Sequence, residues 1–227
     1  MIDLDQRPVL CQGVRVRALP LLVFLSLTAC GASAPGAAFV DTVPDATAPE
    51  GEVETIGLDP TNTKVEVEVS AVGSHSLRFK STGSLTISPK NVLASTVELV
   101  IDTTSAEASM GMVEDMAKSE DFLAVATYPT ATFRSQSLTT GTADKLDLFG
   151  ELSLHGTKKT LKIPAAVAIQ DCDVTVLTEF TLDRHQYGVG TGSSMDGSVG
   201  DDILVRIDVR AKRPNAPSSC TEDAKKT

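Results

Sequence analysis

Apolar and polar side chains alternate along most of residues 64–210, and a period of two residues predicts β-strands. The clearest stretch is 145–169, KLDLFGELSLHGTKKTLKIPAAVAI, which predicts two strands joined by a turn at His155-Gly156. On the first strand the leucines share one face with Gly150, and acidic and hydroxyl side chains share the other. We therefore expect this hairpin to bury one face and to expose the opposite one.

The same alternation predicts further strands over residues 65–69, 77–80, 85–87, 97–101, 131–138, 174–182 and 203–209, with turns at 73–74, 81–83 and 88–91. Residues 105–121 interrupt it, and their apolar spacing is typical of one short amphipathic helix that includes Met112, Val113 and Met116 and leads to Phe122. One short helix cannot cover a flat sheet of about eight strands. The pattern predicts an all-β antiparallel fold and leaves open an up-and-down barrel or a two-sheet sandwich.

The first 29 residues have the features of an export signal. Three arginines precede the apolar run 19–27, which is too short to span a bilayer as a helix. The run ends in Leu27-Thr28-Ala29-Cys30, which resembles the bacterial lipobox, so we expect acylated Cys30 to anchor a lipoprotein to the membrane. Gly31 stands where an Asp retains lipoproteins at the inner membrane of enteric bacteria. This favours the outer membrane, with the domain facing the periplasm.

Composition divides the rest of the chain into three parts. Residues 30–56 are rich in Ala, Pro, Gly, Thr and acids without periodicity, which predicts a flexible tether. The strands occupy one domain over residues 57–212, and a polar tail follows over 213–227. The formal charge of −10 over 227 residues argues against nucleic acid as a partner, because phosphate backbones repel such a protein.

Two cysteines remain once Cys11 leaves with the signal and Cys30 carries lipid. In an oxidising compartment Cys172 and Cys220 can form a disulfide, and closing that loop would contribute on the order of 4 kcal/mol; two free thiols are the alternative. Neither cysteine lies in a CxxC pair or a Cys/His cluster, so a metal site or redox dithiol has little support. We expect no cofactor.

Candidate catalytic residues are sparse. The three histidines have no second ligand at short spacing, which favours solvated or structural roles for His75, His155 and His185. The stretch 192–196, GSSMD, lacks the final glycine of a nucleophile elbow, and the glycines at 188–192 lack the helix and Lys of a phosphate-binding loop. We therefore predict that the protein is not an enzyme.

Three stretches resemble the YceI-like family in the family's own order. They are KSEDF with YPTATF (118–122 and 128–133), GELSLHGTKK (150–159) and LDRHQYGVG (182–190), within a resemblance over about residues 57–212. The family's paired aromatics are Phe122-Leu123 here, and the usual Arg-Asp before Met116 is missing. The resemblance implies a lipocalin-like antiparallel barrel, exported to the periplasm, that binds a polyisoprenoid or similar long lipid, and it favours barrel over sandwich.

An aliphatic barrel interior can shelter a lipid chain, gaining roughly 0.8 kcal/mol per buried methylene. The residues predicted to line such a lipid-binding site are Phe79, Leu99, Ile101, Phe122, Phe133, Leu148, Leu152, Leu154 and Phe180. Ordinary core packing is the alternative for each of them. For the whole protein, the alternative function is a filled barrel or sandwich that acts as a surface module for protein interaction.

Overall fold

The computed structural model describes residues 34–71, 73–217 and 220. The chain divides into two units, Met1–Ala32 and Ser33–Thr227, and the fold described here is that of the second. The predicted export signal and Cys30 lie outside the described residues. None of the described helices has the length and apolar character needed to span a membrane.

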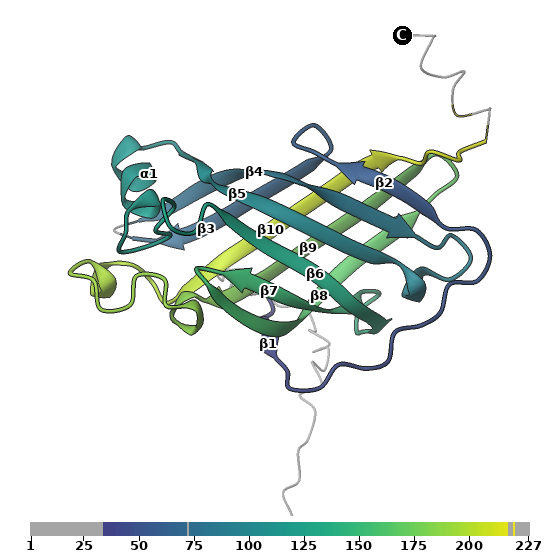
Figure 1. Ribbon diagram of the computed structural model, residues 1–227, viewed down its shortest axis with the longest axis horizontal. Helices are drawn as coiled ribbons and strands as arrows, with labels where there is room; N and C mark the ends of the chain where they lie inside the picture. Colours follow the sequence, from purple (N-terminus) through teal and green to yellow (C-terminus); the bar gives the residue numbers. More distant parts are fainter. Residues whose placement is uncertain (1–33, 72, 218–219, 221–227) are drawn as a thin grey trace, which may run out of the picture. The chain divides into compact units, whose positions relative to one another are not determined.

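Eight antiparallel strands form a closed up-and-down barrel (Figure 1). Each strand pairs with the next along the chain, and the last pairs with the first. The strands are β3 (Thr63–Ser70), β4 (Ser74–Ile87), β5 (Thr96–Ala108), β6 (Thr130–Thr140), β7 (Leu146–Leu154), β8 (Thr157–Ile169), β9 (Asp173–Asp183) and β10 (Asp202–Lys212). The predicted all-β class is therefore confirmed, and the barrel is correct over the sandwich.

Two short strands and four helical segments are also present among residues 34–217. Strand β1 (Ala38–Phe39) pairs with β8, and β2 (Glu54–Leu58) pairs with β4. The helical segments are η1 (Val92–Ala94), α1 (Gly111–Lys118), η2 (Arg184–Tyr187) and η3 (Asp196–Ser198). In Figure 1, α1 and the loops around η2 and η3 lie at one end of the barrel, and β2 lies toward the other.

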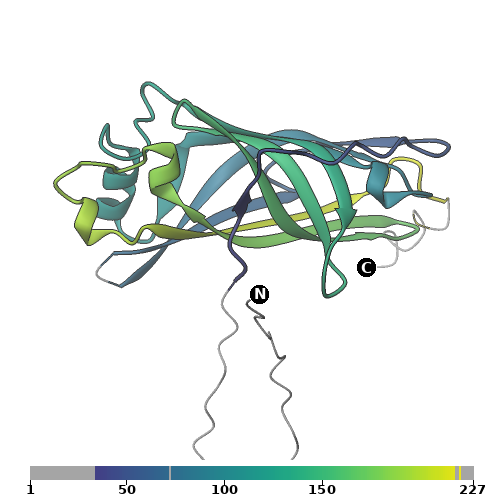
Figure 2. The same ribbon diagram turned by 90° about the horizontal axis from the view of Figure 1, so that it is seen from below.

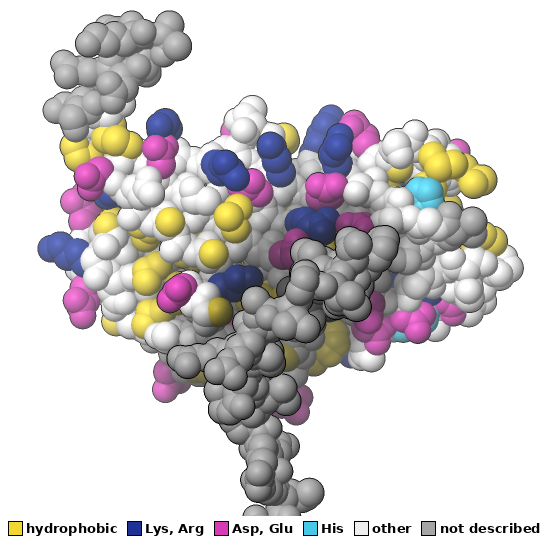
Figure 3. Space-filling model, turned by 180° about the vertical axis from the view of Figure 1, so that it is seen from behind, with side chains coloured by type: hydrophobic (Ala, Val, Ile, Leu, Met, Phe, Trp, Pro, Cys, Tyr) yellow, Lys and Arg dark blue, Asp and Glu magenta, His cyan; other side chains and the backbone are white. Residues whose placement is uncertain are grey.

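The side-chain alternation that predicts the strands also separates the barrel's two surfaces. In β6, for example, buried Ala131, Phe133 and Ser135 alternate with exposed residues. The face shown in Figure 3 carries Lys, Arg, Asp and Glu side chains close together, with hydrophobic side chains scattered among them. The strands bury their apolar faces toward a common interior, as period-two patterning requires.

The β7–β8 hairpin has the predicted two-residue turn. His155 and Gly156 both have positive φ, 50° and 75°, which fits a tight hairpin turn. A Cβ at Gly156 would lie 2.8 Å from the Tyr128 ring, so only glycine fits beside it. Farther along β7, a Cβ at Gly150 would lie 2.4 Å from Cζ of Phe133, because that ring crosses the strand at the glycine.

The structure differs from the sequence-based expectations in two strands. The turn predicted at 81–83 is absent, and β4 runs through it with a register shift between Arg78 and Lys80. Gly83 permits this, because its Cα lies so close to β5 that a Cβ would sit 2.1 Å from the Glu98 carbonyl oxygen. The predicted helical region 105–121 is also too long at its start, since β5 continues to Ala108.

The predicted flexible tether and loose tail are partly ordered on the barrel. Residues 38–39 and 54–56 of the expected tether belong to strands β1 and β2, because the edges of β8 and β4 offer them backbone partners. In the tail, Cys220 is joined to Cys172 by a disulfide, with the two Cα atoms 5.5 Å apart. The Arg213 guanidinium binds the Glu54 carboxylate, and the same contact lowers the pKa of that buried carboxyl.

Candidate functional site

A cavity of about 180 Å³ lies inside the barrel and is lined almost completely by apolar side chains. Its 33 lining residues include only three with polar side chains, Thr103, Thr178 and Arg184. The hydroxyls of Thr103 and Thr178 donate to the carbonyl oxygens of Tyr128 and Pro164, both at 2.7 Å. The lining therefore offers a small polar ligand little to bind, whereas hydrocarbon meets matching surface.

All nine residues predicted as the lipid-binding set line this cavity. They come from six segments of the chain, and the barrel brings their side chains to one interior. The nine are Phe79, Leu99, Ile101, Phe122, Phe133, Leu148, Leu152, Leu154 and Phe180. Lining the cavity is what the structure shows of them; their contact with lipid stays a prediction.

Further lining residues come from segments that the alternation does not cover. Three of them, Val113, Met116 and Ala117, face the cavity from α1. Val189 and Val199 face it from residues 188–200, which we name the glycine-rich loop. The sequence predicts the helix from its apolar spacing. The loop valines had no periodic signal, because they lie among Gly and Ser residues in irregular backbone.

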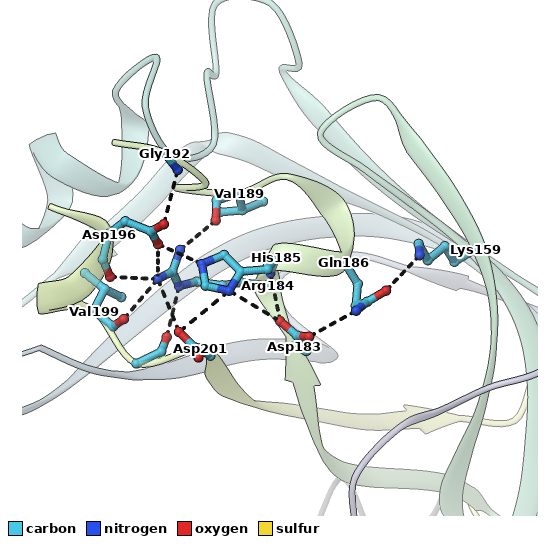
Figure 4. A network of polar contacts seen from close by, with 11 residues as sticks. Lys159, Asp183, Arg184, His185, Gln186, Val189, Gly192, Asp196, Val199 and Asp201 are labelled. Carbon is cyan, nitrogen blue, oxygen red and sulfur yellow. Dashed lines mark hydrogen bonds and ion pairs between the residues drawn. The ribbon is translucent and has the colours of Figure 1, made fainter. Parts of the chain in front are cut away.

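The glycine-rich loop is held over this end of the barrel by the side chain of Arg184 (Figure 4). The guanidinium is 1% exposed and donates to the carbonyl oxygens of Val189, Asp196, Val199 and Gly200 at 2.8–3.0 Å. Its Nη2 also donates to Asp196 Oδ1 at 2.6 Å. One buried cation thus gathers backbone carbonyls that would otherwise have no partner away from water.

Asp196 is the second centre of this network. Its carboxylate contacts His185 Nε2 at 2.7 Å and accepts the Gly192 N–H at 3.1 Å, besides the bond from Arg184. These contacts, His185 first and Arg184 next, hold the pKa of the Asp196 carboxyl well below its ordinary value. Asp183 caps the start of η2 by accepting the backbone N–H of His185. The Asp183-Arg184-His185 segment is thus a structural cluster.

Stretches that are far apart in sequence meet at this end of the barrel. The His155 ring packs edge-on against Tyr128, with 4.7 Å between ring centroids, and its Nδ1 lies 3.2 Å from the Tyr187 carbonyl oxygen. A Cβ at Gly190 would lie 2.8 Å from the Phe122 ring and 2.5 Å from an Arg184 nitrogen. The three family-like stretches of the sequence are therefore one spatial unit that closes the barrel.

Each of the three histidines contacts another protein group in the described part of the chain. Within it, no three His, Cys, Asp or Glu side chains lie together as metal ligands would. His155 and His185 make the contacts given above, and His75 Nε2 lies 3.0 Å from the Ala71 carbonyl oxygen.

The opposite end of the barrel is filled by buried apolar side chains. Four apolar residues are buried toward this end and do not line the cavity: Ile56, Leu85, Ile87 and Leu138. Strand β2 brings Ile56 against this core through its ladder with β4. The cavity is therefore bounded by apolar packing toward one end and by α1 and the glycine-rich loop at the other.

Known proteins resemble both the sequence and this geometry. Over 91 residues the chain is 36% identical to Protein YceI of Escherichia coli, covering 40% of this chain and 47% of that protein. It is 31% identical over 136 residues to a UPF0312 protein of Vibrio vulnificus, covering 58% of this chain and 70% of that protein. The chain thus spans about half the length of the first of these relatives.

Solved structures share the fold at low sequence identity. Burkholderia cenocepacia BcnA superposes with a TM-score of 0.58 at 22% identity, covering 66% of this chain and 96% of that one. A structure described as a polyisoprenoid binding domain from Saccharophagus degradans superposes with a TM-score of 0.56 at 16% sequence identity, covering 72% of this chain and 100% of that one. The YceI-like domain matches residues 57–211, nearly the boundaries that the sequence predicted. Together with the barrel and its closing stretches, this match shows that the chain belongs to the YceI-like family.

Proposed function

We propose that this protein binds a long apolar lipid of the polyisoprenoid type inside its barrel and carries it within the bacterial cell envelope, without catalysing a reaction. The observation that carries the proposal is the cavity, whose lining has three polar side chains among 33 residues. The fold shared with a polyisoprenoid binding domain of Saccharophagus degradans supports the same ligand class.

The size of the cavity constrains how a lipid is held. An apolar cavity of about 150 Å³ stays dry and binds benzene. A cavity of about 180 Å³ thus receives only a short segment of a long chain unless lining side chains move. Met116 is suited to moving, because its unbranched side chain adapts to irregular space. We expect the barrel to expand as the lipid enters, with each buried methylene contributing roughly 0.8 kcal/mol.

The proposal is tested by what the purified protein contains. We expect native mass spectrometry to show bound lipid, and organic extraction to release a species rich in isoprene units. Protein without lipid that also fails to take up added isoprenoid alcohol would contradict the proposal, and the interaction module would then be the better hypothesis.

A charge placed in the cavity wall tests the location. Leu152→Arg should abolish lipid uptake, because a guanidinium would face hydrocarbon. Ser153→Arg on the opposite face of the same strand is the control and should leave uptake unchanged. Leu154→Phe narrows the cavity without burying a charge and should reduce uptake even if Leu152→Arg does not fold. Normal uptake in folded Leu152→Arg and Leu154→Phe protein would move the site elsewhere.

We further propose that acylated Cys30 anchors the protein to the membrane, with the outer membrane as the expected location. The lipobox-like sequence 27–30 supports this. Metabolic labelling with a fatty acid should mark the wild-type protein, whereas Cys30→Ser should lose the label and leave the membrane fraction. A Cys30→Ser protein that stays in the membrane fraction would count against acylation as the anchor.

A further inference from the structure

Strands β8 and β9 pair with each other along only part of their length. Their ladder joins Ala166–Ile169 to Val174–Leu177, although β8 begins at Thr157 and β9 ends at Asp183. Continuing the register would place Lys162 opposite Thr181, but no ladder joins these residues directly. Residues 157–165 of β8 and 178–183 of β9 are not paired with each other, although β7 and β10 pair with their other edges. We name these two stretches the seam.

The sequence gives a reason why the ladder stops. Pro164 has no backbone N–H and lies two residues before Ala166, where the pairing with β9 begins. The Thr178 hydroxyl donates to the Pro164 carbonyl oxygen at 2.7 Å, so a side chain replaces a backbone partner at this point. The two strands then separate along the seam.

A segment from outside the family-matched region occupies the seam. Residues 35–40, which we name the stave, pair with both sides of it: Ala38 lies opposite Lys162, and Gly36 opposite Thr181. The N–H of Ala37 donates to the Thr181 carbonyl at 2.7 Å, and the N–H of Val40 donates to the Thr160 carbonyl at 3.1 Å. Figure 2 shows β1 lying along the barrel wall there. Two strands with a third between them lie roughly 9.5 Å apart, so removal of the stave would leave a gap as wide as one strand.

The cavity lies directly behind this seam. Leu161 and Ile163 on the β8 side line it, as do Phe180 and Leu182 on the β9 side. The stave itself packs Ala37 against the core. Its Phe39 ring lies 6.3 Å from the ring of fully buried Tyr187. The stave therefore completes the wall in front of the apolar interior.

A lipid that entered the cavity by another path would have to break more contacts of the barrel than one that displaced the stave. Elsewhere backbone ladders join neighbouring strands of the wall, with β2 paired to β4 beyond the β3 ladder and β5 joined to β6 over Glu98–Asp102. One end of the barrel is filled by side chains. The other end is closed by α1 and by the loop that Arg184 binds through four carbonyl oxygens and a carboxylate. The stave is short, and its Phe39 is 41% exposed. It is thus the part of the wall that can leave with the smallest loss of structure.

We propose that the seam is the route by which a lipid chain enters and leaves the barrel, and that residues 35–40 are a removable strand that closes it. This inference rests on the proposed lipid-binding function. It also gives the N-terminal segment a role, because Pro35 is five residues from Cys30 and that length of chain spans at most about 17 Å. An acylated Cys30 would hold the seam close to the bilayer.

A disulfide between stave and wall tests the route. Ala38→Cys with Lys162→Cys joins directly opposed residues whose side chains lie at the outer surface. The probe is a fluorescent isoprenoid alcohol in phosphatidylcholine vesicles, and the readout is the rate of its transfer to the protein. We expect the oxidised variant to take up the probe about tenfold or more slowly, because the cross-link prevents the opening that entry requires. Reduction should restore the rate.

A matched cross-link at the short strand β2 is the control. Thr55→Cys with Thr86→Cys clips β2 to β4 in the same way, through residues whose hydroxyls already lie 3.3 Å apart. This variant should take up the probe at the wild-type rate. The uptake rate of the wild-type protein, measured with and without reductant, shows how much of any change comes from reducing the native Cys172–Cys220 disulfide.

A loosened stave gives the opposite result. Ala37→Pro removes the N–H that donates to Thr181 and should accelerate uptake. An unchanged rate in fully cross-linked Ala38/Lys162 protein, or equal slowing by both cross-links, would overturn the seam as the route while leaving lipid binding intact. Wild-type protein that takes up no probe under any condition would instead overturn the proposed function, and the route with it.

Discussion

The two ends of the barrel are closed by different kinds of interaction. Toward the β2 end, Ile56, Leu85, Ile87 and Leu138 fill the interior with side chains that are at most 6% exposed. At the α1 end, a loop and a short helix cover the cavity, and the buried Arg184 holds the loop through its backbone carbonyls. Packing stabilises the first end, and polar bonds stabilise the second.

This difference explains why a cavity exists at all. Side chains that pack to normal density leave no room for a ligand. A loop fixed by hydrogen bonds from its backbone closes an opening without placing large side chains inside it. The loop's glycines fit this role, because Gly190 has a φ of 72° and leaves space for Phe122 and Arg184. The polar network therefore preserves the interior volume that packing would consume.

The largest expected effect on stability comes from removing the Arg184 cation at the α1 end of the barrel, which we call the capped end. Arg184→Met should lower the free energy of unfolding by about 3–5 kcal/mol, because the Asp196 carboxylate and several carbonyls lose their partner. Urea unfolding monitored by circular dichroism measures the loss.

The matched control is an arginine on the outer wall. Arg206 binds Glu68 and Glu179, but its side chain is 40% exposed, so Arg206→Met should cost below about 1 kcal/mol. Similar losses in the two variants would show that burial of Arg184 is not what holds the loop.

A second pair of variants compares packing at the filled end with packing around the cavity. Ile87→Ala should cost about 4 kcal/mol, because Ile87 is fully buried and its removal creates a new void. Leu148→Ala should cost less, about 2–3 kcal/mol, since Leu148 already faces open volume and has fewer atoms in contact on that side. Equal losses, measured by the same urea titration, would mean that the cavity is filled in solution.

The smallest expected effect is a dependence on pH at the capped end. The contacts of Asp196 hold its pKa below the ordinary value, so the ionised carboxylate contributes stability above about pH 4. That contribution is lost as the pH falls from there toward the lowered pKa. Asp196→Asn should therefore be less stable than wild type at pH 7, with the difference shrinking at pH 3. A difference between the urea midpoints that does not change with pH would exclude this carboxylate as the cause.

The sequence identified much of the candidate site because strands have a simple geometry. In a strand, alternate residues face the same side, so the parity of Leu148, Leu152 and Leu154 fixes their common face before the fold is known. Eight of the nine predicted residues lie in strands and line the cavity for this reason, and the ninth, Phe122, lines it from the turn after α1. The cavity-facing positions of α1 and of the glycine-rich loop were not predicted, since the periodicity of a helix does not show which surface it will cover and irregular backbone has no fixed period.

The sequence by itself determined the strands, the hairpin turn at His155-Gly156 and the apolar face of the wall, because these depend on residues near one another along the chain. Only the tertiary structure decided how the wall is completed. Residues 35–40 have little apolar periodicity and form a strand only because two separated strands offer them backbone partners. The same holds for the loop on Arg184, whose conformation depends on bonds from one buried side chain rather than on its own sequence pattern.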